Sequence, residues 1–305
     1  MTSAVVFAYH NVGYRCLSVL LDQGVKVLLV VTHEDNPRET IWFESVAGLA
    51  RLHGIPVITP QDPNVADVIS RIAGLQPDFI FSFYYRLMLK PPLLGSAARG
   101  AFNMHGSLLP KYRGRVPVNW AIIKGERETG VTLHAMTEKP DNGAIIDQQA
   151  VPILENDTAI EVFNKVTVAA EMTLHRALPR LVAGTAQYRP QDLTQGGYFG
   201  GRKPEDGVID WRDSAANIHN LVRGVAPPYP GASTRIGGKP SRVLRTLRES
   251  TSCHADGPAL RIDQDRLVAR CGDGNELRIL ELEVAGVPVT PEDFQRQFGQ
   301  SVRLV

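Results

Sequence analysis

The stretch "DFIFSFYYRLMLKPPLLGSAARGAFNMH" (78–105) decides the fold class of this 305-residue chain. It holds two short apolar runs, at 78–84 and 100–105, which are nearly continuous in the way of strands covered on both faces. Between them, Pro91 and Pro92 open a helical stretch near 91–98, because proline suits the first turn of a helix. A strand, a helix and a second strand in this order predict a parallel, right-handed unit of an α/β sheet.

Working outward, the same alternation extends through the first two thirds of the chain. It predicts a Rossmann-like, mostly parallel sheet with helices on its faces. The first turn, "AYHNVGYRCL", holds only Gly13, so the glycine fingerprint of dinucleotide binding is absent. Function must therefore be sought in a different site. The further predicted strands are 4–9, 26–32, 55–59, 131–137 and 144–153, and the further helices are 13–23, 40–53, 64–74 and 158–184.

The character of the sequence changes after the long helix. The segment "DLTQGGYFGGRKPEDG" (192–207) carries five glycines and a proline, which is typical of a linker or crossing loop. Beyond it, a short helix near 214–223 and several short strands separated by Gly, Pro and Asp predict a small β-rich, OB-like domain. We therefore predict a catalytic domain over 1–191, a linker over 192–207 and a C-terminal domain over 208–305.

Composition excludes several classes of partner. With 33 basic and 32 acidic residues, the formal net charge is +1, so nothing global recommends a nucleic acid or an anionic membrane. Cys16, Cys253 and Cys271 are widely spaced and odd in number, which fits reduced thiols and not a disulfide framework or a zinc site. The N-terminus reads as a buried strand and not a signal peptide, and no uncharged run reaches the roughly 18–20 residues of a spanning helix. These features predict a cytoplasmic protein without membrane insertion.

The candidate active site lies at the end of the 100–105 strand. Asn103 and His105 are two residues apart, so their side chains leave the same face, where the strand end borders the usual ligand crevice. An imidazole can relay a proton from an attacking amine, and a carboxamide can donate to an oxyanion. Asp141, in the tight loop "KPDNG", is the candidate carboxylate. The three residues suit direct attack by a substrate amine on an activated acyl donor, with no Ser or Cys nucleophile and no metal.

Each of these residues, taken alone, is also compatible with an ordinary loop role, and Pro-Asp-x-Gly is common turn chemistry. Lys111, Arg113 and Arg115 alone indicate a solvated basic loop. We interpret three other histidines as structural or exposed: His134, His175 and His219.

The combination resembles a known family. The segment "FNMHGSLLPKYRGRVPVNWAIIKGERETGVTLHAMTEKPDNGAII" (102–146) is similar to the core of the 10-formyltetrahydrofolate-dependent formyltransferases, whose pattern is N-x-H-x-S-x-L-P-x-[YW]-R-G with later G-[VI]-T and D-x-G blocks. "VVFAYHNVG", "THEDNP", "IFSFYYR" and "CGDG" resemble the branch formed by the N-terminal domains of bifunctional polymyxin-resistance proteins. Val116 departs from this pattern, since many relatives carry a smaller residue before Pro117.

The resemblance implies a role for each matching residue. Asn103, His105 and Asp141 match the catalytic trio of the family, and 10-formyltetrahydrofolate is the implied co-substrate, without a metal. The implied folate-binding residues are Leu87, Met88, Leu89, Arg115, Thr137, Glu138, Lys139, Pro140 and Asp141. The candidates for contacts with the sugar substrate are His10, Tyr112 and Arg113.

The implied reaction formylates the 4-amine of UDP-4-amino-4-deoxy-L-arabinose, a step toward lipid A modification and polymyxin resistance. The implied partners are this UDP-amino sugar and folate, and either a homo-oligomer or a fusion to a decarboxylase domain outside this chain is compatible with the resemblance. Three alternatives share the chemistry: an N-formyltransferase for dTDP-amino sugars, a methionyl-tRNA formyltransferase and a formyl-folate hydrolase. A non-catalytic binding module for folate or a UDP-sugar is a fourth. Against tRNA, residues 203–305 hold 14 basic and 14 acidic side chains, although 235–248 is basic.

Overall fold

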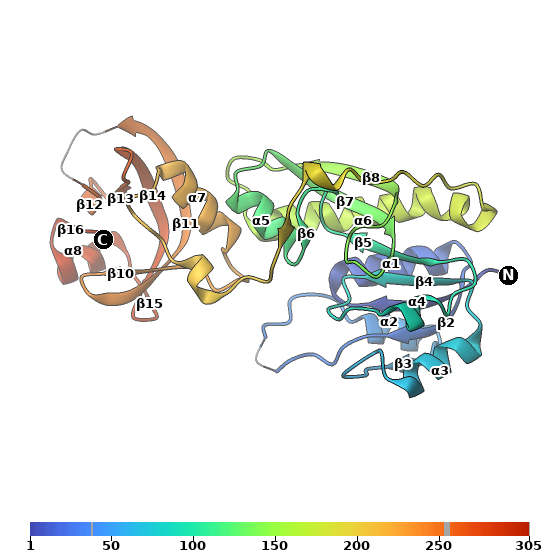
Figure 1. The fold of residues 1–305 in the computed structure, drawn as a ribbon. Helices are drawn as coiled ribbons and strands as arrows, with labels where there is room; N and C mark the ends of the chain where they lie inside the picture. Colours follow the sequence, from blue (N-terminus) through green and yellow to red (C-terminus); the bar gives the residue numbers. More distant parts are fainter. Residues whose placement is uncertain (38, 253–256, 305) are drawn as a thin grey trace. The chain divides into compact units, whose positions relative to one another are not determined.

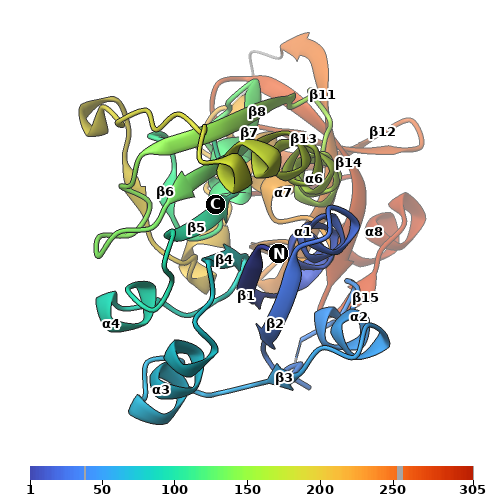
Figure 2. The ribbon, with the colours of Figure 1, turned by 90° about the vertical axis from the view of Figure 1, so that its right-hand side faces the viewer.

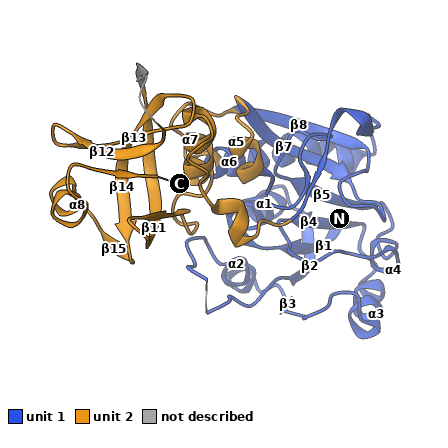
Figure 3. Cartoon of the chain, turned by 60° about the vertical axis from the view of Figure 1, so that its left-hand side comes forward, with its two compact units in different colours: residues 1–117, 128–151, 163–200 blue, residues 118–127, 152–162, 201–305 orange. Residues whose placement is uncertain are grey.

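The computed structural model describes residues 1–37, 39–252 and 257–304. Backbone contacts divide these residues into two compact units, coloured separately in Figure 3. Unit 1 comprises 1–117, 128–151 and 163–200, and unit 2 comprises 118–127, 152–162 and 201–305. The predicted domains are continuous segments, whereas these units interleave along the chain.

Unit 1 is built on a seven-stranded sheet with the order β3-β2-β1-β4-β5-β7-β8 (Figure 1). The pairs from β3 through β5 are parallel, and β5 pairs with β7 in antiparallel fashion. This confirms the predicted mostly parallel sheet. The strands are β1 (Ser3–Ala8), β2 (Lys26–Val31), β3 (Val57–Ile58), β4 (Phe79–Phe83), β5 (Ala101–His105), β7 (Glu128–Ala135) and β8 (Ile145–Pro152).

Helices cover both faces of this sheet, with α3 and α4 on one face and α1 and α6 on the other (Figure 2). Ile72 of α3 and Leu93 of α4 pack with Val5, Phe7 and Ile80 of the strands in one buried cluster. The central strands β1, β2 and β4 are nearly continuous in apolar residues, as expected for strands covered on both faces, and this pattern made them visible in the sequence. The helices of unit 1 are α1 (His10–Asp22), α2 (Val46–Leu52), α3 (Ala66–Leu75), α4 (Pro91–Leu94) and most of α6 (Ala159–Ala183), whereas α5 (Pro117–Ile123) falls almost wholly in unit 2.

A two-stranded parallel ribbon completes unit 1. It pairs β6 (Arg113–Gly114) with β9 (Tyr198–Phe199), beside the short 3-10 helix η1 (Leu193–Gln195). Part of the segment predicted as a linker therefore binds the loop that follows β5. This pairing matters for the site, because it fixes the backbone of residue 114.

The sheet of unit 2 is antiparallel and follows the order β10-β11-β14-β13-β12-β16, with β15 against β14. Its core packs the buried rings of Trp211 and Phe294 with Ile218 and Val222 of α7. The predicted β-rich C-terminal domain is thereby confirmed. Its elements are η2 (Pro204–Gly207), α7 (Ala215–Gly224), β10 (Ala232–Ile236), β11 (Lys239–Ser252), β12 (Ala259–Asp263), β13 (Arg266–Arg270), β14 (Asn275–Val284), β15 (Val287–Pro288), α8 (Pro291–Phe298) and β16 (Ser301–Arg303).

Two of the three cysteines are buried free thiols, Cys16 and Cys271, and Cys253 lies outside the described residues. Among the helices described, none is both long and apolar enough to cross a membrane.

Candidate active site

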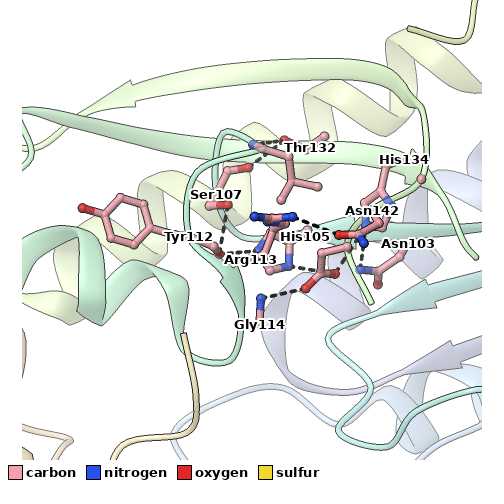
Figure 4. A network of polar contacts seen from close by, with 12 residues as sticks. Asn103, His105, Ser107, Tyr112, Arg113, Gly114, Thr132, His134 and Asn142 are labelled. Carbon is pink, nitrogen blue, oxygen red and sulfur yellow. Dashed lines mark hydrogen bonds and ion pairs between the residues drawn. The ribbon is translucent and has the colours of Figure 1, made fainter. Parts of the chain in front are cut away.

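The site forms where β5 ends beside β7 (Figure 4). Asn103 and His105 project from one face of β5, as the two-residue spacing predicts. The antiparallel register places His134 opposite Asn103, and Thr132 opposite His105. The Asn103 Nδ2 atom lies 3.1 Å from His134 Nε2, so the carboxamide and the second imidazole are in hydrogen-bond contact.

Asp141 lies in the loop between β7 and β8 and faces both imidazoles. Its Oδ1 atom lies 3.4 Å from His105 Nδ1 and 3.6 Å from His134 Nε2. Its other oxygen, Oδ2, accepts a 2.8 Å hydrogen bond from the Gly114 N–H. A Cβ at residue 114 would overlap the Phe199 carbonyl, and the φ angle there is +101°, so glycine is required where the loop passes the carboxylate. The predicted trio is therefore brought together in one place.

Thr132 on β7 holds the turn that follows His105. Its hydroxyl donates to the Ser107 carbonyl at 2.7 Å and accepts from the Leu109 N–H at 3.0 Å. The Ser107 hydroxyl in turn donates to the Lys111 carbonyl at 2.6 Å. Ser107 is fully buried and its proton is used in this contact, so it serves the turn and is not placed as a nucleophile.

The turn also sets the tautomer of His105. Its Nε2 atom lies 2.9 Å from the Tyr112 carbonyl oxygen, which can only accept, so Nε2 carries the hydrogen. In the neutral ring, Nδ1 is then the free lone pair, and it faces Asp141. Burial lowers the pKa of His105, while Asp141 and the Tyr112 carbonyl oppose that effect. The neutral His105 can therefore act as a base, and the Asp141 carboxylate and the Tyr112 carbonyl are placed to accept hydrogen bonds from its protonated form.

Asp141 keeps its charge in this environment. Burial alone would raise its pKa, but the adjacent His105 and His134 rings and the Gly114 N–H outweigh burial and lower the pKa of Asp141 to about 2. The carboxylate is therefore ionised throughout the range in which enzymes work. It can stabilise an imidazolium without itself becoming protonated.

The basic loop divides into an engaged and an exposed part. The Arg113 guanidinium donates to Asn142 Oδ1 and to the Leu193 and Gly196 carbonyls, each at 3.2 Å. Tyr112 is buried and stacks on Phe199 with ring centroids 4.9 Å apart. Both residues therefore brace the loop against 193–199 in this structure. The Arg115 side chain is exposed.

The predicted folate segments occupy neighbouring positions. Leu89 is buried in the cluster under β1 and β4, and Met136 packs against the same cluster. Leu87 and Met88, by contrast, are 36% and 48% exposed. Asn64 fixes this segment, because it donates to the Met88 carbonyl at 2.9 Å and accepts from the Lys90 N–H at 2.8 Å. On the other segment, Thr137, Glu138 and Lys139 are exposed, and Pro140 is partly buried.

His10, the remaining predicted substrate contact, begins α1 directly after β1. Its ring centroid lies 4.0 Å from that of Phe43, 4.5 Å from Trp42 and 4.6 Å from Phe163. Burial lowers the pKa of His10 to about 3. Its immediate surroundings are therefore aromatic rings, and no carboxylate is in contact with it among the residues described.

His134, interpreted from the sequence as structural or exposed, is buried beside the trio. The side chain is only 2% exposed and contacts two members of the trio. The available signal was the run "VTLHAMT", because alternation along a strand next to 100–105 would place His134 on a defined face. The cross-strand register with Asn103 was not visible. His175 and His219 stay outside the site.

No group of three or more potential metal ligands occurs among the residues described. The arrangement instead offers a base, an ionised carboxylate and an amide donor around one point. Such a set can remove a proton from an attacking nucleophile and stabilise an oxyanion.

Two sequence families match the two parts of this chain. Residues 15–178 match the formyl transferase family, and residues 202–299 match the formyl transferase C-terminal domain. The chain therefore belongs to the formyl transferase family and is a formyl-transferring enzyme. The resemblance seen in the sequence is confirmed at the level of the family, and the closer likeness to the polymyxin-resistance branch stays a prediction.

Solved structures share the fold over nearly the whole chain. One is an N-formyltransferase from Helicobacter canadensis in complex with folinic acid and dTDP-3-aminofucose, with 21% identity and a TM-score of 0.72, covering 92% of this chain and 99% of that one. A second is WlaRD, a sugar 3N-formyl transferase in the presence of dTDP and 5-N-formyl-THF. It shares 19% identity and a TM-score of 0.74, covering 92% of this chain and 97% of that one. A third is a sugar N-formyltransferase from Shewanella sp., with 21% identity and a TM-score of 0.64, covering 84% of this chain and 99% of that one.

Proposed function

We propose that this chain transfers the formyl group of 10-formyltetrahydrofolate to the amine of a nucleotide-linked amino sugar. The observation that carries the proposal is the contact of Asp141 with the His105 imidazole, beside the Asn103 carboxamide at the end of β5. This set moves a proton and holds an oxyanion, and it needs no covalent nucleophile. The family supports formyl transfer, and the ligands of the solved neighbours support folate and sugar nucleotides.

In this proposal His105 is the proton carrier. As the sugar amine attacks the formyl carbon and forms the new C–N bond, Nδ1 of His105 takes the proton that the amine loses. The resulting imidazolium donates to the Asp141 carboxylate and the Tyr112 carbonyl, which lie 3.4 and 2.9 Å away. Nδ1 then returns the proton to N10 of the folate as the bond between N10 and the formyl carbon breaks. No proton is left on the enzyme.

Asn103 supports the same step from the other side. The formyl oxygen becomes negative when the amine adds, and an amide N–H of Asn103 is the donor placed to stabilise it. The protonated His105 ring adds a positive charge nearby. Removing one such donor in an enzyme typically costs about 10²–10³-fold in kcat.

We place the folate against the exposed apolar pair Leu87 and Met88, with the 137–141 loop opposite. The buried Leu89 packs in one cluster with the partly buried Met136, which keeps the two segments close. Arg115 is an exposed cation of the basic loop and suits a charged group of the folate. The remaining candidates, His10, Tyr112 and Arg113, are engaged with the chain itself, and their contacts with the sugar stay a prediction.

Two acceptor sugars compete. The sequence resemblance favours UDP-4-amino-4-deoxy-L-arabinose, whose product would be a UDP-4-formamido sugar on a cytoplasmic route to lipid A modification. The neighbours with dTDP or dTDP-3-aminofucose favour a dTDP-amino sugar. The transfer chemistry is the same for both acceptors, which differ in the nucleotide, in the sugar and in the position of the amine.

The test offers 10-formyltetrahydrofolate with each sugar nucleotide and with methionyl-tRNA, and uses His105→Ala as the inactive control. We expect turnover of one or both amino sugars, lost in the variant, and no turnover of the tRNA. Preference for methionyl-tRNA would overturn the sugar assignment. Formate release without any amine would instead indicate a hydrolase.

A further inference from the structure

His134 makes two directional contacts that fix its own tautomer. Its Nδ1 atom lies 2.9 Å from the Ala135 carbonyl oxygen. A carbonyl oxygen only accepts, so Nδ1 carries a hydrogen. A neutral imidazole has a single N–H, and the Nε2 atom of His134 is then a bare lone pair. That atom is the one 3.1 Å from Asn103 Nδ2.

This contact distinguishes the two ends of the Asn103 carboxamide. The NH₂ end can donate to a lone pair, whereas the carbonyl end in the same place would set two acceptors against each other. His134 is only 2% exposed, so an unmatched polar pair at this contact is disfavoured. Without such a partner, the two orientations of a carboxamide are nearly equal in shape.

We propose that His134 is a positioning residue for formyl transfer, which acts by holding the Asn103 amide with its nitrogen end inward so that the second N–H is free for the oxyanion. The inference rests on the proposed function for the role of Asn103. Figure 4 shows the two side chains meeting between β5 and β7. His134 itself need not touch a substrate.

The Asp141 carboxylate is the other group within reach of His134 Nε2. Its Oδ1 atom lies 3.6 Å from His134 Nε2, and the His105 ring centroid lies 6.4 Å from that of His134. A protonated His134 would donate to Asp141 or to the amide oxygen, and Asn103 would have to turn over. In their neutral forms the two rings carry the proton on different nitrogens, His105 on Nε2 and His134 on Nδ1, because each of these atoms faces a backbone carbonyl.

The first test needs no substrate. In ¹⁵N-histidine-labelled protein at neutral pH, long-range ¹H–¹⁵N spectra report which ring nitrogen carries the proton, and His134→Gln assigns the signals. We expect Nδ1 of His134 to be protonated and Nε2 to be bare. A proton on Nε2 would overturn the proposal whatever the enzyme formylates.

The second test uses two substitutions that separate the ring nitrogens. The side-chain oxygen of His134→Gln can reach the place of Nε2 and accept from Asn103, whereas His134→Asn can reproduce only the contact of Nδ1. We expect His134→Gln to keep kcat within about threefold, and His134→Asn to lower kcat by about 10- to 100-fold, as for a weakened oxyanion donor. KM should change little in either variant. Equal losses in kcat would overturn the proposal.

A double substitution shows whether the effect passes through Asn103. In an Asn103→Ala background, His134→Asn should cost less than about twofold in kcat, because the group that it positions is already gone. An undiminished cost there would overturn the proposal.

His219→Asn is the matched control, because His219 is also 2% exposed with both nitrogens hydrogen-bonded. It should lower the melting temperature and leave kcat unchanged. A wild-type chain that formylates no amino sugar would count against the proposed function, while the tautomer measurement would still decide the geometry.

Discussion

Two groups of histidines lie where strands of the same sheet end in unit 1, and they have opposite surroundings. After β5 and on β7, His105 and His134 flank the ionised Asp141. After β1 and β2, His10 and His33 lie among aromatic rings, with His33 stacked on Tyr85 at 4.2 Å between centroids. Burial lowers the pKa of His10 to about 3 and that of His33 to about 4.

The contrast shows what a buried imidazole needs to exchange a proton. Burial disfavours the charged rings of His105, His10 and His33, since an imidazolium loses its hydration. Only beside Asp141 and the Tyr112 carbonyl do acceptors wait for the protonated form. The Nδ1 atom of His10, in contrast, is buried without a hydrogen-bond partner among the residues described. His105 can therefore carry out acid–base chemistry, whereas His10 and His33 serve packing.

Removing the Asp141 carboxylate should have the largest effect, because this charge is what distinguishes the surroundings of His105 from those of His10 and His33. Asp141→Asn leaves an acceptor for the Gly114 N–H but no charge to stabilise protonated His105. We expect kcat to fall by about 10³-fold, within the range for a lost general acid–base contribution. The acid limb of the kcat/KM profile should move to lower pH, because Asp141 raises the pKa of His105. Steady-state kinetics from pH 4 to 9 measure both effects, and an unchanged profile would exclude Asp141 from proton transfer.

The largely buried, neutral His10 predicts how the stability of the fold depends on pH. Above pH 6.5, His10 is neutral in both the folded and the unfolded chain. Below it, the unfolded chain takes a proton that the folded chain refuses until about pH 3, so stability falls as the pH falls. Allowing for partial exposure, the loss between pH 6.5 and 3 is about 3 kcal/mol.

His10→Asn tests this, since asparagine tolerates the φ of +67° at this position. We expect lower stability at pH 7, where the ring packing is lost, but a shallower decline toward acid pH than in the wild type. Urea unfolding at a series of pH values gives the slope. Parallel curves for the two proteins would show that His10 is not a buried neutral group.

The Asp141 carboxylate also makes the folded chain less stable as the pH falls, but in a lower pH range and for a different physical reason. Its pKa is lowered from 3.8 to about 2, so its contribution is complete above about pH 4 and is lost as the pH falls through 2. The amount is about 2 kcal/mol. In Asp141→Asn this segment of the stability curve should be flat relative to the wild type. An identical acid dependence would mean that His105 and Gly114 do not hold the charge.

The sequence predicts the sheet well because its strands are buried on both faces. Apolar runs such as 26–32 and 78–84 are local signals, and the structure has strands there. The helix expected over 40–53 is shorter, at Val46–Leu52, because the segment before it carries Trp42 and Phe43 to the ring of His10. That contact joins distant parts of the chain and leaves no periodic trace.

The site likewise has a part that local sequence predicts and a part that depends on contacts between distant segments. The spacing of Asn103 and His105 is local and predicts a shared face, and the family pattern adds Asp141. The part of His134 depends on the antiparallel register of β5 and β7, and the bracing of Arg113 depends on residues some eighty positions later. Such pairings are set by tertiary packing, so they could not be predicted from the sequence.

The smallest predicted effect concerns the proposed folate segment, and it sharpens the comparison by testing whether apolar side chains near the site bind a ligand. Met88 is 48% exposed, so its loss should not disturb the core. If the folate covers it, Met88→Ser removes about 1 kcal/mol of apolar burial from binding, which raises the KM for 10-formyltetrahydrofolate by about fivefold with kcat unchanged. Leu52→Ser, at an 83% exposed leucine that ends α2, is the matched control and should leave this KM unaltered. Equal KM values in the two variants would move the folate away from the 87–89 segment.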